Sequence, residues 1–302
     1  MKIGVMGSGA VGSFFGSFLS EGGHDVTYIA RGAHLDEMNK NGLTIRGEDE
    51  KRVIRQTFSE KVEDLTDCEL ILFCVKSGDT KEAAERMKEV IHESAYVLSL
   101  QNGVSNEEKL VEIFGQDRVL SAAVYVQAAV ESPGIIQQSG SHKLVIGALQ
   151  ESGQELEKKF AELLNEAGIP TRISSQILLR KWKKYLWNLL FNPLSATTDR
   201  SVGQILDDPY LREIAWMIGL ETIEVATRLG YPLSEEDLQV AFQNAEYART
   251  HTTSMLQDIR KGKVTEADEL VGYLTEKAEV HKISINALQT VYLLLKNKEN
   301  AI

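Results

Sequence analysis

The sequence KIGVMGSGAVGSFFGSFLSE occupies residues 2–21 and combines an apolar run, a glycine-rich turn and a run with helical character. The apolar run, Lys2–Met6, predicts a buried strand, and Ala10–Glu21 predicts a helix that ends at Gly22-Gly23. The turn between them, Gly7-Ser8-Gly9-Ala10-Val11-Gly12, has the pattern G-x-G-x-x-G. Glycine triplets arise by chance, but a strand before and a helix after them are typical of a turn that binds a dinucleotide. The stretch therefore predicts the opening unit of a Rossmann-type domain.

The three glycines of this turn have separate expected roles. Gly7 permits the tight turn, Gly9 lets a pyrophosphate approach the backbone, and Gly12 lets helix and sheet pack closely. The first N–H groups of the helix then face the diphosphate. We expect the cofactor to be bound by Gly7, Ser8, Gly9, Ala10, Val11 and Gly12. The alternative is a glycine-rich turn that serves the structure alone.

The first half of the chain alternates short apolar runs with amphipathic stretches, as βαβ units of a parallel sheet do. Further strands are expected at Asp25–Ala30, Glu69–Val75, Tyr96–Leu100, Val119–Val130, Gly134–Gln138, Lys143–Gly147 and Thr171–Ile173, with a hairpin over Leu43–Phe58. Further helices are expected at Leu35–Lys40, Asp79–Ile91, Asn106–Phe114 and Ser152–Ala167.

After about Ser174 the strand-like runs give way to apolar residues at helical spacing. Helices are expected at Gln176–Phe191, Tyr210–Leu229, Glu235–Arg249, Met255–Lys261, Glu269–His281 and Ile285–Lys296. Ser234 and Ser254 are the expected N-caps of two of these helices. The predicted fold class is therefore α/β, with a Rossmann-type doubly wound parallel sheet in residues 1–173. An all-helical domain for substrate and catalysis is expected to follow in residues 174–302.

Composition limits the classes of function. Hydrophobic residues make up 43% of the 302 residues and charged residues 25%, as in soluble globular proteins. The net charge of −11 argues against general binding of nucleic acid or of an anionic membrane. Five glycines and four serines interrupt the uncharged run from Ile3 to Ser20, so it predicts neither a signal peptide nor a membrane span. The two cysteines, Cys68 and Cys74, form no C-x-x-C pair, which fits a reducing, cytoplasmic location.

The end of the second expected strand indicates which dinucleotide is bound. NAD enzymes usually carry an acidic residue about 20 positions beyond the glycine motif, where it binds the ribose 2′-hydroxyl. Here Arg31 holds that place. A guanidinium can pair with a 2′-phosphate and cannot accept a hydrogen bond from a hydroxyl. The sequence thus favours NADP(H) as the cofactor, the alternative being that Arg31 is a solvated loop residue.

Two more candidates follow expected strands at the carboxyl edge of the sheet, where ligands bind in doubly wound folds. Lys76 comes directly after Glu69–Val75 and is either a cofactor contact or a surface lysine. Asn102 lies in Gln101-Asn102-Gly103, where Asn-Gly also makes an ordinary turn.

The segment Trp182–Pro193 carries a polar stripe on an otherwise apolar helix. Lys184, Asn188 and Asn192 recur every fourth position and therefore share one face. Polar groups in such a setting must be hydrogen-bonded. The stripe either bonds to neighbouring helices or lines a cleft between the domains, where a lysine can donate a proton and asparagines can orient a polar substrate.

Farther along, Thr253-Ser254-Met255-Leu256-Gln257-Asp258 leads into a helix, and Glu266 follows. By spacing alone, Ser254 is equally an N-cap and Glu266 equally a solvated carboxylate.

Together these motifs resemble the ketopantoate reductase (2-dehydropantoate 2-reductase) family over nearly the whole chain. The resemblance rests on G-x-G-x-x-G, on Q-N-G, on K-x-x-x-N-x-x-x-N-P-L-[ST]-A, and on S-S-M-L-Q-D followed by T-E. It implies that an enzyme with NADP(H) as cofactor reduces a small 2-keto acid, 2-dehydropantoate, to (R)-pantoate. That reaction is a step toward pantothenate and coenzyme A.

The resemblance also implies roles for individual residues. Lys184 matches the general acid of the family, and Glu266 matches a glutamate that hydrogen-bonds the reacting oxygen. Substrate contacts are implied for Asn102, Asn188, Asn192 and Ser254. Among these, Ser254 would hold the substrate carboxylate, and Asn102 would lie where cofactor and substrate meet.

Two departures from the family pattern bear on the substrate. Thr253 replaces the first serine of S-S-M-L-Q-D, and Val202 stands where some members carry a substrate-binding asparagine. Another NADP-dependent 2-keto or 3-hydroxy acid reductase of the same architecture is therefore an alternative. A non-catalytic NADP(H)-sensing protein is a second alternative, although both Lys184 and Glu266 are present.

The sequence gives no sign of a metal site. The six histidines show no i,i+3 or i,i+4 pairing and have no cysteine cluster nearby, so no metal is expected. The oligomeric state stays open, with a homodimer as one candidate.

Overall fold

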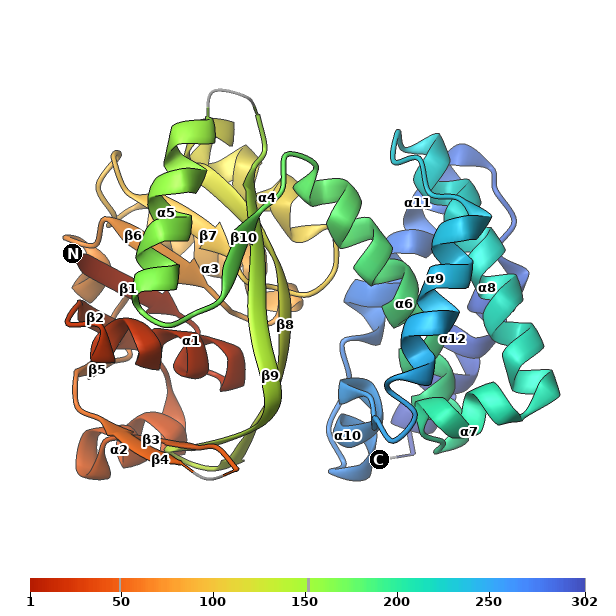
Figure 1. Ribbon diagram of the computed structural model, residues 1–302, viewed down its shortest axis with the longest axis horizontal. Helices are drawn as coiled ribbons and strands as arrows, with labels where there is room; N and C mark the ends of the chain where they lie inside the picture. Colours follow the sequence, from red (N-terminus) through yellow and green to blue (C-terminus); the bar gives the residue numbers. More distant parts are fainter. Residues whose placement is uncertain (49, 151–152, 302) are drawn as a thin grey trace. The chain divides into compact units, whose positions relative to one another are not determined.

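The computed structural model describes residues 1–48, 50–150 and 153–301, in which the chain forms two compact units (Figure 1). The first unit consists of Met1–Asn102 and Asn106–Leu178. The second consists of Leu179–Ile302 together with a short segment from the first half of the chain, Gly103–Ser105. The second unit thus begins a few residues after the expected change at Ser174.

In the described residues the first unit is built on one ten-stranded sheet, in the order β4-β3-β9-β8-β7-β6-β1-β2-β5, with β10 beside β9. Neighbouring strands from β5 to β8 pair in parallel. These strands are β5 (Thr57–Ser59), β2 (Asp25–Ile29), β1 (Lys2–Met6), β6 (Leu70–Phe73), β7 (Tyr96–Ser99) and β8 (Val119–Ser132). Because β1 lies between β2 and β6, its carboxyl end is the point where ligands bind in a doubly wound sheet.

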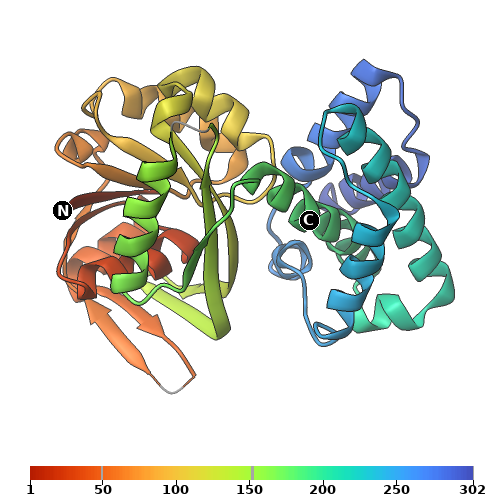
Figure 2. The same cartoon turned by 45° about the horizontal axis from the view of Figure 1, so that its top comes forward.

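The other edge of the sheet corrects two expectations. Gly134–Gln138 and Lys143–Gly147 are not separate strands, because one long strand, β9 (Ile135–Ala148), pairs antiparallel with β8. The expected hairpin over Leu43–Phe58 covers only two strands, β3 and β4, since β5 pairs with β2 instead. The remaining strands are β3 (Leu43–Arg46), β4 (Lys51–Ile54) and β10 (Thr171–Ile173), and Figure 2 shows β3 and β4 as a two-stranded ribbon at the border of the unit.

Helices cover both faces of this sheet. They are α1 (Ala10–Glu21), α2 (Gly32–Asn41), α3 (Thr80–Lys88), α4 (Asn106–Phe114) and α5 (Gln154–Glu166). Phe14 of α1 and Phe160 of α5 belong to the same apolar cluster as Leu72, whereas Met87 of α3 belongs to the cluster of the next strand residue, Phe73, on the opposite face. Both faces of the strands are apolar because both are buried. The expected start of the last helix, Ser152, lies outside the described residues.

The second unit is helical in the part that the structure describes. Its elements are α6 (Ile177–Thr198), α7 (Val202–Asp207), α8 (Pro209–Arg228), α9 (Glu235–Glu246), α10 (Ser254–Arg260), a π-helical turn (Asp268–Gly272), α11 (Tyr273–His281) and α12 (Asn286–Glu299). The sequence did not predict α7, and α6 does not end at Phe191 but continues through Pro193. A proline removes one backbone hydrogen bond, and the apolar packing of α6 outweighs that loss.

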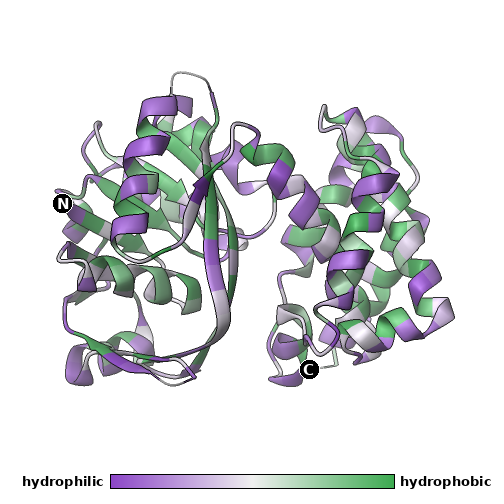
Figure 3. Ribbon diagram, viewed as in Figure 1, coloured by the Kyte–Doolittle hydropathy of each residue, from purple (hydrophilic) through white to green (hydrophobic). Residues whose placement is uncertain are grey.

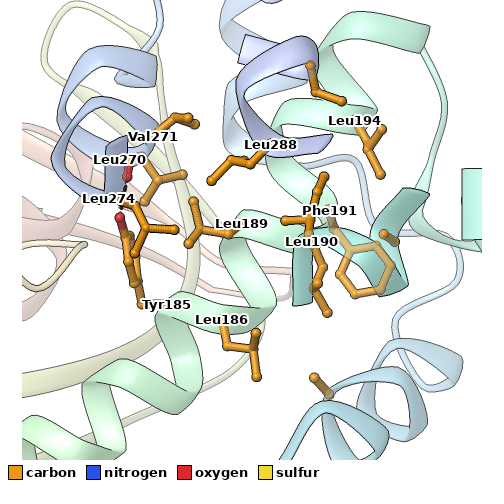
Figure 4. Packing of buried hydrophobic residues seen from close by; sticks show 14 of the residues in the cluster. Tyr185, Leu186, Leu189, Leu190, Phe191, Leu194, Leu270, Val271, Leu274 and Leu288 are labelled. Atoms are coloured by element: carbon orange, nitrogen blue, oxygen red, sulfur yellow. Dashed lines mark hydrogen bonds between the residues drawn. The ribbon is translucent and has the colours of Figure 1, made fainter. Parts of the chain in front are cut away.

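The core of the second unit explains why α6 is so long. Tyr185, Leu186, Leu189 and Leu190 of α6 are buried, and Figure 4 shows Tyr185 and Leu189 pointing toward residues of the π-helical turn, α11 and α12. The Tyr185 hydroxyl donates a hydrogen bond to the backbone carbonyl of Leu270. Figure 3 shows the same pattern at larger scale, with green residues on the inner sides of the helices and purple residues on their outer sides. None of the helices that the structure describes is long and apolar enough to cross a membrane.

Candidate functional site

The glycine-rich turn between β1 and α1 depends on two glycines for its shape. Gly7 has φ +97°, a conformation that L side chains rarely adopt, and a Cβ there would lie 2.7 Å from the backbone nitrogen of Val75. A Cβ on Gly12 would lie 2.9 Å from Cγ1 of Val5, so only glycine lets α1 pack this closely on β1. These positions therefore admit no other residue without a backbone shift.

The other residues of the turn fit an anionic ligand. A Cβ on Gly9 would meet nothing within 4 Å, so the described chain leaves space at the start of α1. Gly9 has no side chain with which to cap the helix, which leaves the first N–H groups for a ligand or water. The Ser8 hydroxyl is buried and has no hydrogen-bond partner among the described residues. A buried polar group of that kind needs a partner, and a dinucleotide diphosphate would supply one.

His34 of α2 holds the connection between β8 and β9, and the sequence did not single it out. Its Nδ1 accepts a hydrogen bond from the Gly134 N–H at 3.0 Å, which requires the neutral ring. Burial lowers the pKa of His34, which favours this neutral form. The histidine thus links α2 to the connection between β8 and β9.

Two cations lie at the carboxyl ends of the strands on either side of β1. Arg31 follows β2, and its guanidinium lies 3.1 Å from the carboxylate of Asp79, which precedes α3. Lys76 follows β6 and is exposed. Both candidates therefore stand at the edge of the sheet that holds the glycine-rich turn.

A buried polar network fixes the segment that carries Asn102. The Gln101 amide donates to the carbonyl of Val75 at 2.9 Å and to the Thr80 hydroxyl at 2.7 Å. That hydroxyl donates to Asn106 at 2.9 Å, and the Asn106 amide donates to the carbonyl of Asn102 at 2.8 Å. Gln101, Thr80 and Asn106 are buried, whereas Asn102 is exposed. The buried hydrogen bonds thus fix the backbone that carries the exposed side chain of Asn102. The sequence predicted Asn102 but not the network beneath it.

The polar stripe lies within one continuous helix. Because α6 runs from Ile177 to Thr198, Lys184, Asn188 and Asn192 share one face. Asn192 is 8% exposed, and the other two are partly buried.

Lys184 has an unusual environment. Burial of its ammonium and, to a smaller extent, the positive charge of Lys181 one turn away together lower the pKa of Lys184 to about 7. Lys181 is itself 4% exposed and was not predicted as a site residue, although its i,i+3 spacing from Lys184 is visible in the sequence. An amine with a pKa near neutrality can both hold and release a proton at physiological pH.

The start of α10 corrects the expected role of Ser254. The N-cap is Thr253, whose buried hydroxyl accepts a hydrogen bond from the Leu256 N–H at 3.2 Å. Ser254 is the first helical residue and is exposed. Because the preceding threonine does the capping, the Ser254 hydroxyl is not needed for the helix. Ser234, in contrast, caps α9 as expected.

Glu266 lies at the start of the helical segment that contains the π-helical turn, and its carbonyl accepts a hydrogen bond from the Leu270 N–H at 3.0 Å. Single π-helical turns occur often at functional sites. Val202, the departure from the family pattern, is fully buried in the apolar core of the second unit.

The predicted residues are thus divided between the two units. The first carries the Gly7–Gly12 turn, Arg31, Lys76 and Asn102, and the second carries the substrate and catalytic candidates Lys184, Asn188, Asn192, Ser254 and Glu266. Across the described ranges, no three His, Cys, Asp or Glu side chains form a group that could hold a metal.

Two family models match the chain. The one described as "Ketopantoate reductase PanE/ApbA" matches residues 3–151, and "Ketopantoate reductase PanE/ApbA C terminal" matches residues 176–299. A 2-dehydropantoate 2-reductase of Pyrococcus horikoshii is 32% identical over 300 residues, which cover 99% of this chain and 98% of the relative.

Solved structures show the same similarity. A PanE/ApbA family ketopantoate reductase from Ralstonia eutropha has a TM-score of 0.92 and 31% identity, with 100% of this chain and 99% of that chain covered. A D-mandelate dehydrogenase in a ternary complex with NADH and anilino(oxo)acetate has a TM-score of 0.93 over 100% of this chain and 99% of its own. At 22% identity, the second likeness concerns the fold alone.

Proposed function

The chain belongs to the ketopantoate reductase family, and from that premise we propose that it reduces 2-dehydropantoate to (R)-pantoate with NADPH. The observation that carries the proposal is the position of Lys184 on a helix face shared with two asparagines, together with its pKa of about 7. An acid of that strength suits proton donation to an alkoxide at neutral pH.

The cofactor would be held by the first unit. The space at Gly9, the buried Ser8 hydroxyl and the uncapped start of α1 fit a diphosphate, and the cation of Arg31 fits a 2′-phosphate. Lys76, at the end of the neighbouring strand, is a second cation for the same ligand. When bound, the nicotinamide supplies a hydride to C2 of the keto acid.

The chain's own residues have the remaining tasks. Lys184 gives its proton to the oxygen that becomes the hydroxyl, and its positive charge stabilises that oxygen as negative charge develops. Glu266 accepts the hydrogen bond of the hydroxyl so formed. Ser254 donates a hydrogen bond to the substrate carboxylate, and Asn188 and Asn192 orient the substrate, a contribution of positioning.

A second candidate is reduction of a different 2-keto acid by the same residues. Val202 favours it, because an apolar side chain buried in the core cannot make the substrate contact of the asparagine found in some members. The D-mandelate dehydrogenase with a similar fold shows that this architecture accepts an aryl 2-keto acid analogue in another protein.

The test is oxidation of NADPH, followed by its absorbance, with ketopantoate, 2-ketoisovalerate and benzoylformate as substrates. The proposal predicts the highest kcat/KM with ketopantoate and a loss of kcat/KM in Glu266→Ala with normal NADPH binding. A higher kcat/KM with another acid favours the second candidate. Absence of turnover with all three contradicts both.

A further inference from the structure

We propose that Glu299, at the end of α12, is a positioning residue that fixes Glu266 for its contact with the substrate. The inference rests on the proposed function, because it assigns to Glu266 a role at the reacting oxygen. Glu299 lies 33 positions beyond Glu266, and none of the sequence motifs includes it.

The contacts of Glu299 converge on the residues next to Glu266. One carboxylate oxygen accepts hydrogen bonds from the Thr265 N–H at 2.9 Å and from the Thr265 hydroxyl at 2.7 Å. The same hydroxyl accepts a hydrogen bond from the Ala267 N–H at 3.1 Å. Thr265, immediately before Glu266, is therefore bonded directly to the Glu299 carboxylate, and Ala267, immediately after it, is bonded to the Thr265 hydroxyl; Thr265, Ala267 and Glu299 are all buried.

Two further side chains of α12 extend this anchor. Lys296 lies 2.9 Å from Glu299 and 3.0 Å from the carboxylate of Asp268, and the Tyr292 hydroxyl donates a hydrogen bond to Asp268. Positions 292, 296 and 299 lie on one face of the helix. That face thus contacts Thr265 through Glu299 and the Asp268 carboxylate through Tyr292 and Lys296, on the two sides of Glu266.

The negative charge of Glu299 destabilises the helix in which it lies. It is the last residue of α12, where the helix dipole disfavours a negative charge. Burial also acts to raise its pKa, but the ion pair with Lys296 and the hydrogen bonds from Thr265 outweigh burial and keep the pKa below its ordinary value. A charged carboxylate is thus maintained at an unfavourable place, and its bonds reach the segment that carries Glu266.

A rigid backbone on both sides determines where the Glu266 carboxylate can go. The main-chain carbonyl of Glu266 accepts a hydrogen bond from the Leu270 N–H. A main-chain group of each of the residues 265, 266 and 267 is therefore hydrogen-bonded. Misplacement of a reacting group by about 1 Å can cost about 100-fold in rate. Loss of the Glu299 anchor should therefore reduce catalysis without touching the cofactor.

The chain offers a matched control at the other end of the same helix. Glu221 of α8 accepts hydrogen bonds from the N–H groups of Ala287 and Leu288 at 2.8 and 2.9 Å. Glu221→Ala thus also removes a carboxylate that holds two hydrogen-bond donors of one segment, but it acts on the first turn of α12. Glu299→Ala is the test variant, and Glu299→Gln keeps an acceptor oxygen for Thr265. Thr265→Val and Thr265→Ser form a second pair, which remains usable if Glu299→Ala does not fold.

Kinetics and melting are measured on the same samples, with ketopantoate and NADPH. Glu299→Ala and Thr265→Val should lower kcat about 10- to 100-fold with an unchanged Kd for NADPH. Glu299→Gln and Thr265→Ser should restore kcat to within about threefold, and Glu221→Ala should leave it within about threefold of wild type at a similar loss of melting temperature. In a Glu266→Ala background, Glu299→Ala should change kcat less than about twofold.

Equal losses of kcat in Glu221→Ala and Glu299→Ala would overturn the inference. So would a loss of kcat on adding Glu299→Ala to Glu266→Ala that is as large as the loss in the wild-type background. Hydrogen exchange separates this failure from that of the proposed function. The Thr265 and Ala267 amides should exchange at least about tenfold faster in Glu299→Ala, whether or not ketopantoate is the substrate. Unchanged exchange contradicts the anchor itself.

Discussion

The Arg31 guanidinium lies 3.1 Å from the carboxylate of Asp79, so two residues 48 positions apart form an ion pair at the edge of the sheet. The two side chains are 87% and 52% exposed, and such a pair contributes little to stability. Its effect is local, because it holds a cation at the carboxyl end of β2, beside the glycine-rich turn. Cofactor preference should therefore depend on both members of the pair.

Removal of the cation should weaken NADPH selectively. A charge-assisted contact with a 2′-phosphate is worth about 1.5–3 kcal/mol, so Arg31→Ala should raise the Kd of NADPH roughly 10- to 150-fold. NADH lacks that phosphate, and its Kd should change little. Titration of both cofactors by fluorescence measures the two constants. Equal constants in the wild-type protein would contradict the assignment of NADP(H).

Removal of the carboxylate should have the opposite effect. If a 2′-phosphate binds Arg31, the Asp79 carboxylate competes with it for the guanidinium and repels the phosphate. Asp79→Asn should therefore lower the Kd of NADPH by up to about fivefold, the scale of an exposed ion pair. The gain should shrink at high ionic strength because salt screens exposed charges. Weaker NADPH binding in this variant would show that Asp79 orients Arg31 instead of competing for it.

The proposed proton donor, Lys184, can be tested against its neighbour on the same helix. Lys184→Ala should lower kcat about 10²–10⁴-fold, the usual scale of general acid catalysis, with little change in NADPH binding. Lys183 points away from the Asn188 side of α6 and pairs with Asp237 at 2.6 Å, which makes Lys183→Ala the matched control. A comparable loss in the control would mean that the stripe is not the catalytic face.

The lowered pKa of Lys184 predicts the direction in which kcat and folding stability change with pH. The proposed reduction requires the protonated amine of Lys184, so kcat should fall as the pH rises through about 7. The unfolded chain keeps an ordinary lysine pKa of about 10.4, so between these values it binds more protons than the folded chain and stability rises with pH. Below pH 7 Lys184 is protonated in both the folded and the unfolded chain, so the buried charge lowers the free energy of unfolding by its full amount. Lys184→Met should therefore raise the melting temperature most at pH 6 and least near pH 10.

The cap of α10 separates a structural effect from a functional one. Thr253→Ala removes the N-cap and should cost about 1 kcal/mol of unfolding free energy. Ser254→Ala removes an exposed hydroxyl that caps nothing, so its melting temperature should stay near that of wild type. Its KM for ketopantoate should nevertheless rise, because contact with the substrate carboxylate is binding shared by ground and transition states. An unchanged KM would remove Ser254 from the site.

The local pattern of the sequence was enough to predict the strand–turn–helix start, the alternation of strands and helices, and the helix face that carries Lys184. Each of these depends on residues within a few positions of one another, through turn geometry or helical period. The close approach of Gly12 to Val5 belongs to the same group, because both residues lie in this one stretch, whereas the close approach of Gly7 to Val75 depends on a segment 68 positions farther along.

Tertiary structure decided what depends on partners distant in the sequence. β5 joins β2 instead of extending a hairpin, and Arg31 pairs with Asp79, because strand order brings these segments together. The capping role fell to Thr253 and not Ser254, since a one-residue shift in the start of a helix depends on how that helix packs. The anchor between Glu299 and Thr265 exists only because α12 folds back on the segment around Glu266. The sequence around a charged residue at the end of a helix does not indicate which distant backbone groups it will bind.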